Sequence, residues 1–357
     1  MNLDPRQAMV RDSRIIVGLL SILSIMGFGA VLYQVRTIVL PFALAVFLSY
    51  ILNPLISFFE KRRVPVPVSI LIAVLITFVI LGVLGVMINE SIQSFAREFP
   101  KYETRFGVII DNLIAFFRLP PELFSSTTDG SQRFQMLTGL DKLSVTELIT
   151  NTLSSITKFL SNTVLVLLFL LFILMGRNQL IKKIELAFDD SMSEKLVGIA
   201  TNINQQIQKY IIAKTLISLA TAFLVTVVLY SFGVKFALIW GIMTFLLNFI
   251  PSIGSVIATL LPATITVIQF ENYLTIFLVV ILLVVIQFVM GNLIDPKVVG
   301  GSVNLSPLVI LFSLIFWGWL WGIVGMFLAV PLSVLVKIVF ENIQSLRFIS
   351  VLMSARE

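Results

Sequence analysis

Long hydrophobic runs separated by short polar segments set the pattern of this chain. A helix needs about 20 apolar residues to cross the hydrocarbon core of a bilayer. Six runs reach that length: Ile15–Val35, Ile38–Phe59, Val66–Ile88, Ile156–Gly176, Ile211–Val234 and Tyr273–Ile294. The first run follows arginines, as a signal peptide would, but it is long and lacks a small-residue cleavage site. We therefore predict an all-α polytopic membrane protein that keeps this first span.

Two further apolar stretches are interrupted near their middle. Phe236–Phe270 and Leu305–Phe340 each divide into halves of about 15 to 18 residues, which is short for a complete crossing. The interrupting residues are Asn248, Pro251, Ser252 and Gly254 in the first stretch, and Gly318, Gly322 and Gly325 in the second. Each stretch is expected to form a broken helical hairpin, with two short tilted crossings as the alternative. Six long spans and two hairpins give about eight hydropathy segments.

Two amphipathic segments connect the spans. Between Phe95 and Phe117 apolar residues recur at near-helical spacing, which predicts a helical extracytoplasmic segment that caps the lipid surface or packs on neighbours. A substrate gate is the alternative.

The expected organisation of the chain has seven parts. They are an amino-terminal three-helix membrane region at 1–88, the extracytoplasmic segment at 89–155, a fourth span at 156–176, a cytoplasmic amphipathic connection at 177–209, a span plus outer broken hairpin at 210–272, a span plus inner broken hairpin at 273–341, and a cytoplasmic tail at 342–357.

The placement of lysine and arginine predicts the orientation. With the amino terminus inside, most basic residues fall in inner segments, and the short outer turns hold only Arg36 and Lys235. Cytoplasmic loops carry this excess in membrane proteins. We expect both termini to face the cytoplasm of a bacterial inner membrane, with the lipid bilayer as the first partner.

The two interrupted stretches follow spans that run in opposite directions, so the second half of the chain reads as two inverted units. Matching breaks in inverted units point to the binding site of a secondary transporter. The pathway candidates around the first break are Asn248, Pro251, Ser252, Gly254 and Ser255. Pro251 and Gly254 are expected to free backbone groups for solvent or ligand. For Asn248, hydrogen bonding between helices is an equal alternative to ligand binding.

The second unit contributes Gly322 and Gly325 at its break, and two polar residues at the end of the last long span. Asn292 and Asp295 should share nearly the same helical face. An ionisable group at this depth suggests proton or sodium coupling, and Lys297 is a possible companion. The plainer interpretation pairs Asp295 with Lys297 at the cytoplasmic edge. Lys214, inside an apolar run, is expected to extend to the inner headgroups.

The amino-acid composition excludes several kinds of functional site. Hydrophobic residues make up 58% of the 357 residues and charged residues 12%, and there is no cysteine or histidine. This excludes disulfides, thiolate nucleophiles, Ser-His-Asp triads and ordinary zinc sites. No phosphate-binding GxxxxGK[ST] loop occurs. The net charge of +6 is spread between apolar runs, so nucleic-acid binding is not expected. We expect no cofactor and no enzymatic activity.

Three stretches of sequence carry a resemblance to a known family. GVKFALIWGIMTFLLNFIPSIGSVIATLLP and GNLIDPKVVGGSVNLSPLVILFSLIFWGWLWGIVGMFLAVPL resemble the paired signature regions of the autoinducer-2 exporter family, also called the PerM permease family. VLPFALAVFLSYILNPLISFFEKRRVP resembles its second span and basic loop. The motif positions are Asn248, Pro251, Gly254, Gly291, Asn292, Asp295, Pro296, Gly300, Ser306, Gly318, Gly322, Gly325 and Pro331. Other members often have glutamate where this chain has Asp295.

The resemblance covers essentially the whole chain and implies a transporter, closest to members described as exporters of the quorum-sensing signal autoinducer-2. Export of autoinducer-2, or of a similar small polar metabolite, is therefore the leading hypothesis. Some members are described as sodium/proton antiporters, which is the alternative. The third possibility is a membrane scaffold without transport. A homo-oligomer is also expected, because the apolar outer segment could pack between protomers.

Overall fold

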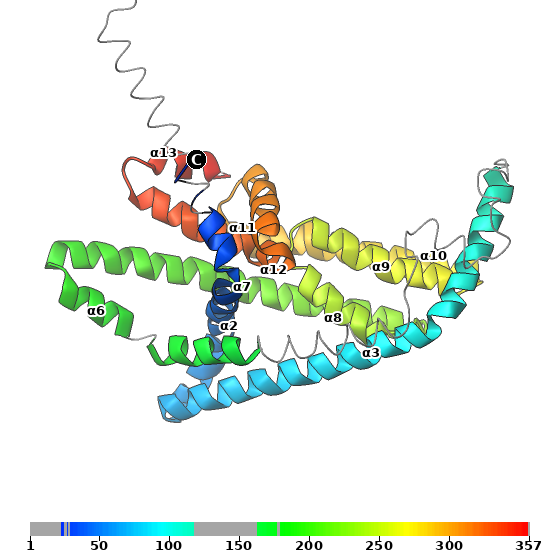
Figure 1. Cartoon of the computed structure of the whole chain (residues 1–357), viewed down its shortest axis with the longest axis horizontal. Coiled ribbons are helices and arrows are strands. Elements are labelled where there is room, and N and C mark those ends of the chain that lie inside the picture. Colours follow the sequence, from blue (N-terminus) through cyan, green and yellow to red (C-terminus); the bar gives the residue numbers. More distant parts are fainter. Residues whose placement is uncertain (1–22, 25–26, 28, 118–162, 177–178, 356–357) are drawn as a thin grey trace, which may run out of the picture.

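The computed structural model describes residues 23–24, 27, 29–117, 163–176 and 179–355 (Figure 1). Within these ranges the chain is helical and contains no strand. The helices are α2 (Arg36–Lys61), α3 (Val66–Phe117), an unlabelled helix at Thr163–Gly176, α6 (Gln179–Ala187), α7 (Asp190–Ser231), α8 (Ala237–Leu247), α9 (Ile253–Gln269), α10 (Tyr273–Phe288), the π-helical segment η2 (Val289–Ile294), α11 (Asp295–Val303), α12 (Pro307–Asn342) and α13 (Arg347–Met353).

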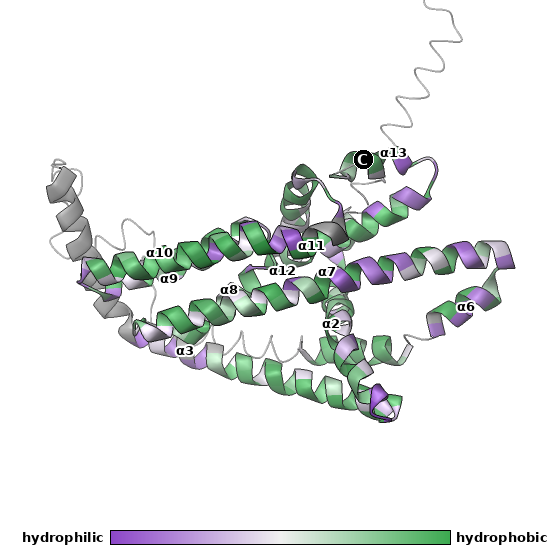
Figure 2. Ribbon diagram, turned by 180° about the vertical axis from the view of Figure 1, so that it is seen from behind, coloured by the Kyte–Doolittle hydropathy of each residue, from purple (hydrophilic) through white to green (hydrophobic). Residues whose placement is uncertain are grey.

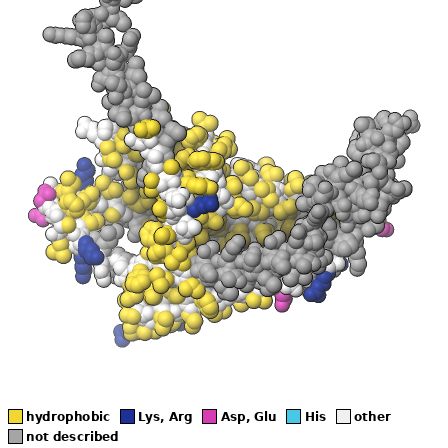
Figure 3. Space-filling model, viewed as in Figure 1, with side chains coloured by type: hydrophobic (Ala, Val, Ile, Leu, Met, Phe, Trp, Pro, Cys, Tyr) yellow, Lys and Arg dark blue, Asp and Glu magenta, His cyan; other side chains and the backbone are white. Residues whose placement is uncertain are grey.

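Five helices of the described ranges are long and apolar enough to cross a membrane, and the count is six if the pair Thr163–Gly176 and Ile181–Ala187, bent by 59°, is taken as one span. On the face shown in Figure 3, hydrophobic side chains cover the middle and most charged side chains lie toward the edges. The prediction of a polytopic helical membrane protein is confirmed. Most of the expected span Ile15–Val35 and the beginning of Ile156–Gly176 fall outside the described residues.

Two helices continue past the ends of their apolar runs. Helix α3 extends through the boundary expected at residue 88, and α7 combines the polar residues from Asp190 to Lys209 with the apolar residues that follow. Figure 2 shows this change from hydrophilic to hydrophobic along α7. Neither junction carries a glycine or proline, so the backbone has no reason to leave the helix there. The rest of the segment expected at 89–155, from residue 118, lies outside the described residues.

Both interrupted stretches turn back on themselves. Between α8 and α9 the chain turns at Ser252, which has φ 61° and ψ −56°. Helix α12 is two limbs that meet at Gly322, whose φ of 67° and ψ of −146° are not helical. The second geometry is one that only glycine adopts readily. The predicted breaks therefore occur at the expected places.

The limbs of each hairpin approach at backbone distance. A Cβ atom added to Gly254 would overlap the carbonyl oxygen of Leu247, and one added to Gly325 would overlap that of Trp317. The limbs of the second hairpin are also joined by a 2.6 Å hydrogen bond from the Ser333 hydroxyl to Ser313 Oγ. The two glycines thus serve equivalent structural purposes in the two hairpins.

The hairpins pack on each other and on α2. Ile250, in the first turn, lies in one apolar cluster with Leu314 and Ala329 from the two limbs of α12. Close by, the rings of Phe249 and Phe327 have centroids 4.5 Å apart, and Phe47 of α2 contacts both at 5.6 and 4.8 Å. These rings belong to the largest buried core, which also includes Ile207, Tyr210 and Ile211 of α7.

Replacing either close-approach glycine should destabilise the fold. We expect Gly254→Ala and Gly325→Ala each to lower the free energy of unfolding by about 1–3 kcal/mol or more, because the new methyl meets backbone rather than a movable side chain. Thermal unfolding in detergent measures the effect. Gly82→Ala is the control, since a Cβ there has open space, and it should be neutral or slightly stabilising. Equal melting temperatures for all three variants would contradict the prediction.

Candidate functional site

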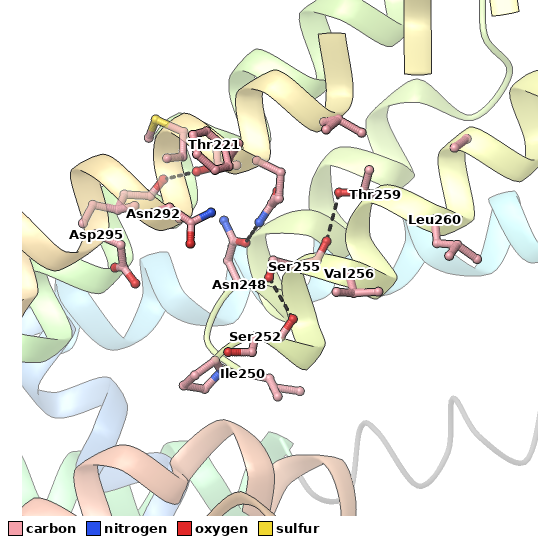
Figure 4. Close-up of a pocket in the computed structure, with 18 of the residues that line it drawn as sticks. Thr221, Asn248, Ile250, Ser252, Ser255, Val256, Thr259, Leu260, Asn292 and Asp295 are labelled. Atoms are coloured by element: carbon pink, nitrogen blue, oxygen red, sulfur yellow. Dashed lines mark hydrogen bonds between the residues drawn. The ribbon is translucent and has the colours of Figure 1, made fainter. Parts of the chain in front are cut away.

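A cavity of about 590 Å³ lies between α7, the first hairpin and the segment from α10 to α11. Apolar side chains make most of its wall. The polar side chains in the lining are those of Lys214, Thr221, Asn248, Ser252, Ser255, Thr259, Gln287, Asn292 and Asp295. These residues come from the two units that the sequence set in opposite directions. Figure 4 shows Asn292 between Asn248 and Asp295 at the wall of the cavity.

The first turn satisfies most of its own backbone. The amide of Gly254 donates to the carbonyl of Ile250 at 3.0 Å, and the amide of Ile253 donates to the carbonyl of Pro251 at 2.6 Å. The expectation that Pro251 and Gly254 would leave backbone groups for solvent or ligand is wrong for these two groups, because the turn closes on itself. Side chains therefore supply most of the polar chemistry on this side of the cavity.

Asn248 connects the two units directly. It is buried at the end of α8, and its Oδ1 accepts a 2.9 Å hydrogen bond from Nε2 of Gln287 in α10. An amide has four hydrogen-bonding positions, so this bond leaves capacity for a ligand. Asn248 therefore bonds between helices, as one of its two expected roles required, and it also lines the cavity; ligand binding stays a prediction.

Ser252 has an unfavourable backbone conformation in the turn between α8 and α9. Its φ and ψ, together with the Ile253-to-Pro251 hydrogen bond, define a γ-turn of the rare, strained kind. A serine at positive φ costs free energy that the surrounding packing must offset. Its carbonyl accepts from the hydroxyl of Ser255 at 2.9 Å (Figure 4). Both serines line the cavity as predicted.

A π-helical segment places the second unit's polar residues. In η2 the amide of Asp295 donates to the carbonyl of Met290, five residues earlier. Pro296 follows and has no N–H to continue the usual α-helical pattern. Local π-helix of this kind occurs frequently at functional sites. Both Asn292 and Asp295 line the cavity, in agreement with the prediction that they share a face.

Asp295 pairs with Lys214. Lys214 Nζ lies 2.9 Å from Asp295 Oδ2, and the exposed fractions of the two side chains are 9% and 25%. The expectation that Lys214 extends to the headgroups is wrong, because the half-buried carboxylate of Asp295 offers its ammonium a closer partner. Asp295 Oδ1 is buried and has no hydrogen-bond partner among the described residues.

Four predicted residues lie outside the cavity lining. Gly254, Gly322 and Gly325 shape the hairpins but do not line this cavity. Lys297 is exposed, and the plain interpretation that it pairs with Asp295 is replaced by the Lys214 contact.

The sequence interpretation did not select Lys214, Gln287 or Thr221 as site residues, although all three line the cavity. An ionisable residue inside an apolar run is by default a functional candidate, so Lys214 carried a usable signal. The described residues contain no group of three acidic side chains that could hold a metal ion.

A broken hairpin beside a cavity that holds a cluster of polar side chains, among helices long enough to span, defines a polytopic helical membrane protein. The comparisons specify the class. Residues 20–345 match the AI-2E family transporter profile, so the chain belongs to that family.

Two relatives from Escherichia coli (strain K12) match along nearly their full length. The chain is 36% identical over 323 residues to the AI-2 transport protein TqsA, covering 89% of each sequence. It is 31% identical over 330 residues to the protein named "Putative transport protein YhhT", covering 91% of this chain and 90% of the relative.

Replacing one partner of the Lys214–Asp295 ion pair should destabilise the protein more than replacing both partners. We expect Asp295→Asn to lower the free energy of unfolding by about 3–5 kcal/mol, because Lys214 is left buried without a counter-charge. The double variant Lys214→Met/Asp295→Leu should recover most of that loss. Thermal unfolding in detergent compares them, with Lys297→Met as the control on an exposed lysine. Additive losses in the double variant would show that the two charges do not depend on each other.

Proposed function

We propose that this protein exports autoinducer-2, or a similar small polar metabolite, across the bacterial inner membrane. The observation that carries the proposal is a cavity among apolar helices whose wall holds a cluster of polar side chains. Its volume of about 590 Å³ lies in the range of small-molecule sites, about 300 to 1,000 Å³. The name of TqsA, as an AI-2 transport protein, supports the choice of substrate.

The cavity suits an oxygen-rich solute. The amides of Asn248, Gln287 and Asn292 offer donors and acceptors, and the hydroxyls of Ser252 and Thr221 add acceptors. The apolar remainder of the wall gives a bound solute a less polar surrounding than water, which strengthens its hydrogen bonds to these groups. Both units contribute, so relative movement of the units would change the site as a whole. In this proposal both termini lie in the cytoplasm. The net direction of transport follows the outward gradient of the signal.

Efflux of autoinducer-2 from cells that lack their own exporter tests the proposal. The intact chain should accelerate efflux, and Asn248→Ala should reduce the rate about tenfold, the effect of losing buried hydrogen bonds to a solute. Asn202→Ala is the matched control, because Asn202 is exposed and lies outside the cavity. Membrane levels of each variant must be equal. Unchanged efflux with the intact chain would refute the export of this signal.

A sodium/proton antiporter is the second candidate, supported by one observation. Asp295 has a buried oxygen without a partner among the described residues, on a carboxylate that already pairs with a lysine. If Lys214 moved away from this carboxylate, the carboxylate could bind a proton and a sodium ion in turn. In inverted vesicles, sodium should then change the internal pH, and Asp295→Asn should abolish the response. A chain that exports autoinducer-2 without any sodium-dependent pH change would exclude this candidate.

A further inference from the structure

A second cavity lies on another side of α7. Its volume is about 790 Å³, and it is lined by residues of α2, the helix Thr163–Gly176, the start of α6 and the polar half of α7. The nearest lining residues of the two cavities on α7 are Gln205 and Lys214. They are nine positions apart on the helix, which is about 13 Å along its axis. The two cavities are therefore distinct sites.

Helical geometry also separates the cavities by direction. At about 100° per residue, Thr201, Asn204 and Gln205 share one face of α7. The α7 residues of the first cavity, Lys214, Ile217 and Thr221, lie on roughly the opposite face. Buried Ile207, Tyr210 and Ile211 of the core lie between them along the helix.

Two polar rows face each other across the second cavity. Ser49, Asn53 and Ser57 recur every four residues on α2, a helix apolar enough to span a membrane. Thr201, Asn204 and Gln205 form the opposing row on α7. Polar residues in a spanning helix are costly unless they face a partner or a water-filled space. Their spacing at i, i+4 and i+8 directs them all to this space.

The chemistry of this lining differs from that of the first cavity. No lysine, arginine, aspartate or glutamate is among the described lining residues, whereas the first cavity contains Lys214 and Asp295. Hydroxyl and amide groups both donate and accept hydrogen bonds. The rings of Tyr50 and Phe172 add flat apolar surface. This combination suits a small, uncharged, hydroxyl-bearing molecule and offers nothing to balance a charge.

We propose that the second cavity is a separate binding site for a small uncharged hydroxylated solute. Its role as the loading site on the cytoplasmic side rests on the export function proposed above. The sequence predicts that the end of α2 near Lys61 and the polar half of α7 face the cytoplasm, so the cavity opens where an exported solute must first bind.

Cysteine protection tests the site directly, because the natural chain has no cysteine. Thr201→Cys is placed in the lining, and Asn202→Cys is its neighbour outside the lining; both side chains are exposed. The probe is autoinducer-2, added to the purified full-length protein during maleimide labelling. At ten times its dissociation constant it should slow labelling of Thr201→Cys about tenfold and leave Asn202→Cys unchanged. Gln205→Cys, a second lining position, should behave as Thr201→Cys does.

A background variant separates the two cavities. Protection of Thr201→Cys should persist when Asn248→Ala weakens the first cavity. Loss of protection in that background would show that the effect arises from the first cavity and would overturn the proposal. Absence of protection at both lining cysteines, or equal protection of the control, would overturn it as well.

Transport measurements distinguish this inference from the export function. Asn204→Leu should raise the internal concentration needed for half-maximal efflux about tenfold, through lost hydrogen bonds, while the maximal rate stays the same; Asn202→Leu should change neither. Normal efflux without protection at Thr201→Cys refutes the second site alone. Protection without any efflux refutes the export function and retains the binding site.

Discussion

A chain that turns around inside an apolar layer must satisfy its backbone groups internally, and this constraint determines the structure around the cavity. Both hairpins reverse direction with the same two features. The turn residue adopts positive φ, and a glycine a few residues later allows the limbs to touch at backbone distance. Because the turn at Ser252 uses its own amides and carbonyls, most of the wall's polar surface consists of side chains.

The Lys214–Asp295 pair follows from the same scarcity of water. A charge held away from water needs a counter-charge, and the π-helical turn before Pro296 places the carboxylate where α7 can supply one. The pair links the span of the first unit to the end of the last long span. Replacing both residues by apolar ones would cost the fold little, so stability alone does not explain why the charges are present. Both side chains line the cavity, where the proposed transport would use them.

Local signals in the sequence were sufficient for the fold class and the breaks. Proline, glycine and polar residues inside apolar runs predicted both turns, and Asn248, Ser252, Ser255, Asn292 and Asp295 all line one cavity. The partners of these residues were not predictable, because Lys214 and Asp295 are 81 positions apart and meet only through packing. The length of α7 was also missed, since hydrophobicity marks where a membrane segment ends and not where a helix ends.

The core between the two cavities limits how a solute could use both. Phe47, Phe249 and Phe327 join α2 to the two hairpins, with Tyr210 of α7 buried in the same core. A polar solute cannot pass through packed aromatic rings without losing its hydrogen bonds. Passage from the second cavity to the first therefore requires these helices to separate or to carry the solute as they move. Since each ring belongs to a different element, such a movement would loosen the contacts between the hairpins and α2, while the turn at Ser252, closed by its own hydrogen bonds, would keep its conformation.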